Sequence, residues 1–186
     1  MGTRRQADAE ALPRPGGASM SAFDNRFRPA RNWETELAAG LQARGWEVCE
    51  FGQGQLSDAA HEALRGWRDT FGRPSLIRWL PDLLAWRDSD VYMIDAKSET
   101  EKNEDSPNVA VELDAFNVGI SIEQVLNTPM LYVWKCGAAT PRTIENRWAR
   151  RHDGGRTDGS GTAFLLMDKR YLTPLTSVFG ERQEAA

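Results

Sequence analysis

Three charged residues lie inside two otherwise apolar segments of the chain, and they limit how it can fold. Asp82 interrupts the apolar run 79–86, while Asp95 and Lys97 lie at the end of the run 91–97. Burying a charged group is costly unless it is paired or bound to a metal. The fold therefore has to bring these three groups to each other, to a cation or to a surface.

A polar turn at residues 87–90 separates the two segments, which predicts a β-hairpin with a short loop. Side chains alternate between the two faces of a strand, so Asp95 and Lys97 point to the same side. The neighbouring strand of the hairpin can place Asp82 beside Asp95. Two carboxylates and one ammonium would then converge at one end of a sheet.

This combination of charges indicates a particular chemistry. Two converging carboxylates repel each other, which raises the pKa of one of them unless a cation lies between them. A hard divalent cation with oxygen ligands, Mg²⁺ or Mn²⁺, meets that need. A lysine two residues beyond an acidic ligand can orient or deprotonate a water molecule, or stabilise charge on a phosphate. The three residues thus predict a metal-dependent phosphodiester hydrolase.

The same residues form two short motifs separated by twelve residues, Pro81-Asp82 and Asp95-Ala96-Lys97. They resemble the PD-(D/E)xK signature of restriction endonucleases and archaeal-type Holliday junction resolvases. The resemblance covers roughly residues 32–135. It implies an α/β fold with a restriction-endonuclease-like mixed central β-sheet flanked by helices, and residues 55–74 would add a helical insertion before the catalytic hairpin.

The resemblance also implies roles for individual residues. Asp82, Asp95 and the backbone carbonyl of Ala96 would bind Mg²⁺ or Mn²⁺, and Lys97 would position or activate water. The implied activity is cleavage of DNA by a structure-selective or recombination- and repair-type endonuclease, and many such enzymes act as homodimers. The alternative is a non-catalytic module on the same fold that binds nucleic acid or protein.

A catalytic glutamate is expected on the first helix, which is predicted to begin after the N-cap residue Asn32 and to end at Gly45. Residues two apart on a helix point about 200° apart, so only one of Glu34 and Glu36 can face the site. The resemblance favours Glu34, because of its spacing to Gly45, as a metal ligand directly or through water. Glu36 is the alternative.

Basic residues are unevenly distributed along a chain whose net charge is −4. The acidic total argues against a protein that coats nucleic acid without regard to sequence. Residues 1–28 are predicted to form a flexible basic arm, and residues 29–186 a single domain. The segment 142–161 is predicted to be a mobile basic loop, with four candidate DNA-binding residues: Arg147, Arg150, Arg151 and Arg156.

Periodicity predicts the remaining elements. A strand is expected over 46–51, a buried helix over 109–126, strands over 130–134 and 162–167, and a short helix after Pro174. A helix capped by Ser57 is expected to bury one face, formed by Ala60, Leu64, Trp67 and Phe71. Accessory polar residues of the site are sought among Ser98, Glu99, Thr100, Glu112, Glu123 and Gln124.

Other classes of protein are disfavoured. The two cysteines, Cys49 and Cys136, cannot build a disulfide framework or a zinc cluster. No apolar run reaches the roughly 18 residues that a membrane span needs, and no secretory signal is recognised. We therefore expect a cytoplasmic protein without a membrane partner.

Overall fold

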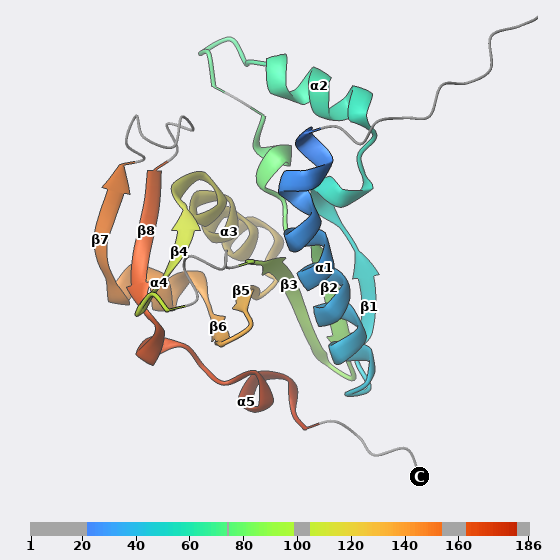
Figure 1. Cartoon of the computed structure of the whole chain (residues 1–186), viewed down its shortest axis with the longest axis vertical. Coiled ribbons are helices and arrows are strands. Elements are labelled where there is room, and N and C mark those ends of the chain that lie inside the picture. The colour runs from blue at the N-terminus through green and yellow to red at the C-terminus, as the bar shows by residue number, and fades with distance from the viewer. Residues whose placement is uncertain (1–21, 74, 99–104, 154–162, 182–186) are drawn as a thin grey trace, which may run out of the picture.

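A computed structural model of the chain describes residues 22–73, 75–98, 105–153 and 163–181. Its centre is a five-stranded sheet in the order β1-β2-β3-β5-β6 (Figure 1). The strands are β1 (Glu47–Glu50), β2 (Leu83–Arg87), β3 (Asp90–Ala96), β5 (Met130–Trp134) and β6 (Gly137–Ala139). Strand β3 pairs parallel with β5 and the other pairs are antiparallel, so the predicted mixed sheet of an α/β fold is confirmed.

Helices cover both faces of this sheet (Figure 1). Helix α1 (Ala22–Gln42) packs on one face, where Ile94 is buried. Helix α3 (Leu113–Leu126) packs on the other face, against Met93 and Tyr132. Successive residues of a strand point to opposite sides, so the neighbours Met93 and Ile94 belong to two different cores.

A second sheet, in the order β4-β8-β7, lies beyond α3 and was not predicted. Its strands are β4 (Asn108–Glu112), β7 (Trp148–Asp153) and β8 (Ala163–Asp168). The single helix predicted over 109–126 is therefore wrong at its start. Val109 and Val111 are buried on either side of exposed Ala110, which is the period of a strand, and β-branched residues favour that conformation.

The basic segment after residue 141 is ordered rather than a mobile loop over its described part. Helix α4 (Pro141–Arg147) begins after the N-cap Thr140, whose hydroxyl accepts a hydrogen bond from the backbone N–H of Thr143. Strand β7 follows directly and pairs antiparallel with β8. Residues 154–162, and Arg156 with them, lie outside the described residues.

The first helix begins at Ala22, so the start predicted at Asn32 is wrong. Asn32 is exposed inside α1, because a residue that favours a helix start does not prevent a helix from continuing upstream. The predicted end agrees, with Gly45 at φ +79°. The domain boundary expected at residue 28 falls within α1, and residues 1–21 lie outside the described part.

The helical insertion before the hairpin is confirmed. Helix α2 (Asp58–Gly66) is capped by Ser57, as predicted, and the short 3-10 helix η2 (Leu76–Trp79) follows it. The expected apolar face is wrong at its end: Trp67 is 50% exposed and Phe71 is 80% exposed, because α2 stops before them. The hairpin of β2 and β3 turns tightly, with Arg87 opposite Asp90.

Three short helices complete the fold: η1 (Gly52–Gln55), η4 (Lys169–Tyr171) and α5 (Leu175–Phe179). The last is the predicted C-terminal helix, and Phe179 packs its ring edge-on against Trp46 with centroids 5.6 Å apart. None of the helices in the described parts of the chain combines the length and the apolar character needed to cross a membrane.

Candidate active site

Asp82 is held at the start of β2 by backbone hydrogen bonds to both neighbouring strands. Its N–H donates to the Ile94 carbonyl at 2.8 Å, and its carbonyl accepts from the Phe51 N–H at 2.6 Å. Its carboxylate oxygen Oδ2 accepts from the backbone N–H of Ala96 at 2.8 Å. The hairpin therefore brings the Asp82 carboxylate to the residue that follows Asp95.

Asp95 and Lys97 point to the same face of β3 and form an ion pair. The Lys97 Nζ lies 2.7 Å from Asp95 Oδ2, and Asp95 is only 6% exposed. The ammonium also lies 5.8 Å from the centroid of the Tyr132 ring. The Lys97 N–H donates to the Val133 carbonyl at 2.8 Å, which fixes the lysine backbone against β5.

Tyr132 is fixed from the side of α3. Its hydroxyl donates to the Ala115 carbonyl at 2.8 Å. A Cβ on Gly119 would lie 2.2 Å from that hydroxyl oxygen, so the helix admits the tyrosine only because residue 119 has no side chain. Burial, and then the negative charges of Asp95 and Glu123, raise the pKa of Tyr132, so its hydroxyl remains a donor.

The Asp82 carboxylate lies within range of two other negative charges, those of Asp95 and Glu34. Burial raises the pKa of Asp82 to about 8, and the negative charges of Asp95 and Glu34 act in the same direction. The Ala96 N–H and the Lys97 ammonium act against this shift. Ionised Asp82 is thus unfavourable here unless a further positive charge is present.

For the pKa of Lys97, the neighbouring charges outweigh the effect of burial. Burial lowers its pKa, but the attraction and hydrogen bond of Asp95, with the charges of Asp82 and Glu112, outweigh burial and raise the pKa above its usual value. The side chain therefore stays protonated at neutral pH. In this arrangement Lys97 can donate hydrogen bonds and attract negative charge, but it cannot accept a proton.

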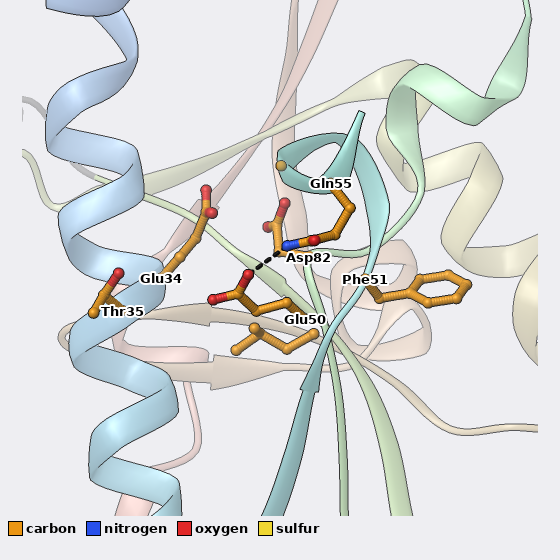
Figure 2. A pocket seen from close by; sticks show the side chains of 8 residues that line it. Glu34, Thr35, Glu50, Phe51, Gln55 and Asp82 are labelled. Carbon is orange, nitrogen blue, oxygen red and sulfur yellow. Dashed lines mark hydrogen bonds between the residues drawn. The ribbon is translucent and has the colours of Figure 1, made fainter. Parts of the chain in front are cut away.

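A cleft of about 200 Å³ opens on one side of Asp82. It is lined by Glu34, Thr35, Glu50, Phe51, Gly54, Gln55, Asp82 and Leu83. In Figure 2, Glu34 reaches into it from α1, opposite Gln55 and Glu50, which are joined by a hydrogen bond from the Gln55 amide. The cleft therefore lies between the first helix and the start of the hairpin.

The structure places Glu34 and Glu36 in different surroundings. Glu34 lines the cleft and its charge acts on Asp82, whereas Glu36 pairs with Lys135 at 3.5 Å outside the cleft lining. Both partners of that outer pair are more than half exposed. The geometry thus agrees with the preference for Glu34, and its chemical role stays a prediction.

Glu50 lines the cleft although it was not predicted as a site residue. It ends β1, where it lies opposite Leu83, one residue after Asp82. Its position at the same sheet end follows from the pairing of β1 with β2. Alternation within residues 46–51 predicts the strand, but no local pattern identifies the strand that pairs with it.

The wall formed by η1 depends on Gly52. This residue has φ +74°, and a Cβ there would lie 2.2 Å from the Pro81 carbonyl oxygen. Only glycine tolerates both the backbone conformation and the close approach. The loop is thus seated directly on the Pro81-Asp82 peptide.

The donor chemistry of the site suits a hard divalent cation. Asp82 and Asp95 supply carboxylate oxygens beside each other, and their repulsion is the kind that a cation relieves. Among the described residues, no three His, Cys, Asp or Glu side chains are grouped so that they could hold a metal ion. Two carboxylates would therefore be completed by other oxygens, such as a backbone carbonyl or water.

The remaining candidate residues lie in different surroundings. Glu112 accepts a hydrogen bond from Trp79 Nε1 at 3.1 Å, and its charge acts on Lys97, so it belongs to the surroundings of the lysine. Glu123 instead accepts from the Met130 N–H at 3.3 Å, while Gln124 and Ser98 are exposed. Glu99 and Thr100 lie outside the described residues.

Arg147 is the one candidate DNA-binding arginine whose side chain is described, and it is not part of the cleft lining. Arg147 is exposed at the end of α4, with its guanidinium 5.3 Å from the centroid of the Tyr171 ring. Arg150 and Arg151 lie on β7, and only their backbone is described. Their role in DNA binding stays a prediction.

Comparison with known proteins gives similarity at the level of structure. No family model matches the sequence, and no curated protein does. The Holliday junction resolvase Hjc of Archaeoglobus fulgidus, an archaeal hyperthermophile, is 11% identical, with a TM-score of 0.49 over 81% of this chain and 99% of that one. D212, a nuclease from a fusselovirus, is 9% identical, with a TM-score of 0.42 over 91% of this chain and 93% of that one.

Proposed function

We propose that the chain is a nuclease that hydrolyses phosphodiester bonds in DNA with the help of Mg²⁺ or Mn²⁺. One observation carries the proposal: the Lys97 ammonium lies 2.7 Å from the buried Asp95 carboxylate, beside Asp82, whose pKa is raised by burial and by the charges of Asp95 and Glu34. A protonated lysine next to carboxylates that repel each other is suited to a site that takes up a cation and a phosphate together.

Asp82, Asp95 and the backbone carbonyl of Ala96 would hold the cation. When bound, the ion would supply a water molecule of lowered pKa and positive charge for a phosphoryl oxygen. We assign Glu34 a role through a water molecule, because the described residues contain no group of three carboxylates. Glu50 lies across the same cleft and would act in the same outer position.

The protein groups then have distinct tasks. Lys97 would orient the attacking water or stabilise the negative charge that grows on the phosphate. Asp95 holds the ammonium in place through the 2.7 Å contact. Glu112 adds a second negative charge near the lysine.

The test is a panel of labelled duplex, junction, flap and single-stranded DNA, incubated with Mg²⁺, Mn²⁺ or EDTA. Wild type is compared with Lys97→Ala, and Lys135→Ala is the matched control, because Lys135 also pairs with a carboxylate, that of Glu36, but lies on the surface. We expect metal-dependent cleavage that Lys97→Ala lowers by about 100-fold or more while binding persists. Cleavage by Lys97→Ala at the wild-type rate would show that this mechanism is wrong.

The same panel separates the proposal from its alternative. A protein that binds DNA and cuts none of these substrates with either metal would be a non-catalytic binding module. The panel also decides whether the preferred substrate is a branched structure, as a recombination- or repair-type endonuclease requires.

A further inference from the structure

A loop that is held by several internal hydrogen bonds follows α2 and carries an aromatic ring at its tip. We call residues 69–73 the Phe71 loop. The Asp69 carboxylate accepts hydrogen bonds from the backbone N–H groups of Phe71 and Arg73, both at 2.8 Å, and from Arg73 Nε at 2.7 Å. One side chain thus fixes the backbone on both sides of the tip.

Backbone contacts close the loop as well. The Asp69 N–H donates to the Arg73 carbonyl and the Gly72 N–H donates to the Asp69 carbonyl, both at 3.0 Å. Gly72 has φ +76°, a conformation that glycine adopts without strain. The loop is therefore preorganised, and a ligand that binds there would not have to order it.

The Phe71 ring stands in solvent with a cation over it. The side chain is 80% exposed, and the Arg73 guanidinium lies 5.2 Å from the ring centroid. Single exposed apolar residues are common on proteins. The Phe71 ring is a more specific feature, because the backbone that carries it is fixed by hydrogen bonds and a guanidinium lies over the ring.

The Phe71 loop lies at the end of the molecule that holds the candidate active site. Figure 1 shows α2 and the chain that follows it at the end from which β2 starts. The chain runs from the loop through η2 to Asp82, and η2 contacts η1, whose residues line the cleft. Two apolar side chains along this path are exposed, Leu76 at 56% and Ile77 at 45%, and Phe51 of the cleft lining is 39% exposed.

The local charge favours a phosphate-bearing partner. Residues 63–78 contain four arginines and one acidic residue, in a chain whose net charge is −4. Aromatic rings and guanidinium planes stack on the faces of bases, whatever the base. Paired bases within a duplex are already stacked on each other, so this platform suits bases that are unpaired.

We infer that the Phe71 loop binds unpaired bases of a DNA strand by stacking, next to the candidate active site. The inference rests on the proposed function in taking DNA as the partner. Phe71 supplies the stacking surface, Arg73 adds its guanidinium plane, and Asp69 is a positioning residue that holds both. The substrate class is then DNA with a single-stranded segment near the scissile phosphate.

The test measures binding by fluorescence anisotropy in EDTA, so that cleavage does not interfere. The probes are a labelled oligothymidylate, the same strand paired with its complement, and a strand of equal length with tetrahydrofuran in place of every base. Phe71→Ala is compared with Val125→Ala, which removes an equally exposed apolar side chain (79%) from the end of α3. Phe71→Trp tests whether another aromatic ring preserves binding.

We expect Phe71→Ala to raise the Kd for oligothymidylate about fivefold or more, the loss of one base stack, and to leave the Kd for duplex unchanged. The Kd of wild type for the baseless strand should equal the Kd of Phe71→Ala for that same strand, because without bases the ring has nothing to stack on. Val125→Ala and Phe71→Trp should bind oligothymidylate as wild type does. An unchanged Kd for Phe71→Ala, or an equal rise for single strand and duplex, would overturn the inference.

Three further results distinguish the stacking loop from a contact between two copies of the chain and from the proposed nuclease. If Phe71→Ala binds oligothymidylate normally but no longer self-associates in sedimentation velocity, the loop joins two copies of the chain and the inference is wrong. If wild type cuts no DNA but loses single-strand binding with Phe71→Ala, the proposed nuclease fails while the stacking loop stands. Metal-dependent cleavage with no effect of Phe71→Ala on single-strand binding would support the nuclease and overturn the stacking loop.

Discussion

The Lys97 ammonium lies 2.7 Å from the Asp95 carboxylate, on the face of β3 that is covered by α3. The pair is largely buried, with side-chain exposures of 21% and 8%. A buried pair contributes less to stability than its short distance suggests, because both groups lose hydration. Removing one partner is a different matter, since it leaves a buried charge without its counter-charge.

We therefore expect Asp95→Asn to lower the free energy of unfolding, by at most about 3–5 kcal/mol. Glu112 also attracts the lysine, which moderates the loss. The matched control is Glu36→Gln, which breaks the exposed pair with Lys135 and should cost less than about 1 kcal/mol. Urea denaturation in EDTA measures the free energy of unfolding of both variants. Equal losses would contradict the statement that Asp95 and Lys97 form a buried ion pair.

The two glutamates of α1 should differ in their effect on cleavage. We expect Glu34→Gln to lower metal-dependent cleavage by about 10- to 100-fold, as removal of a group that acts through a metal-bound water does. Glu36→Gln should cleave at the wild-type rate, because Glu36 pairs with Lys135 outside the cleft. Rates measured against Mg²⁺ concentration test this, and a larger defect in Glu36→Gln would reverse the assignment.

The raised pKa of Asp82 makes stability depend on pH. In the folded state Asp82 keeps its proton up to about pH 8, whereas its ordinary value is 3.8. Between these values the unfolded chain binds fewer protons than the folded one, so the contribution of Asp82 to stability falls as pH rises. The slope is at most about 1.4 kcal/mol per pH unit.

Asp82→Asn removes this titration and can still accept the Ala96 N–H. We expect the variant to gain stability relative to wild type as the pH rises from 5 to 8 in EDTA, as judged by urea midpoints. Parallel stability curves for the two proteins across that range would show that Asp82 ionises normally.

Gly52→Ala should damage both the fold and the site. The added Cβ would meet the Pro81 carbonyl at 2.2 Å in a positive-φ conformation, so we expect a loss of more than about 1 kcal/mol, together with reduced cleavage. Gly66→Ala is the control, because a Cβ there has no atom within 4 Å. Thermal unfolding of wild type, Gly52→Ala and Gly66→Ala compares their stabilities.

The site motif was predictable because it violates the pattern around it. Asp82 and Asp95 stand among apolar residues, and the alternation of a strand places Asp95 and Lys97 on one side whatever the rest of the fold. The same periodicity failed at Val109, because β4 ends at Glu112 and α3 begins at the next residue, with no connecting loop between them. It also failed at Phe71, whose helical spacing to Leu64 has no meaning once α2 ends at Gly66.

Contacts between distant segments could not be predicted from local patterns. Glu50 joins the cleft because β1 pairs with β2, and Glu36 forms an ion pair with Lys135 from a distant part of the sequence. The second sheet arises from the pairing of β4 with β8, which are separated by more than fifty residues. A local pattern predicts a strand but not its neighbour.

The missing side chain at Gly119 has a consequence for Lys97. Because the Tyr132 hydroxyl occupies that position, the packing of α3 determines where the tyrosine ring lies, and the ring is the surface beside the Lys97 ammonium. Gly119 thus influences, through Tyr132, the surface that lies beside the Lys97 ammonium. A small shift of the axis of helix α3 would therefore move the Tyr132 ring and change the position that the Lys97 ammonium can take in the site.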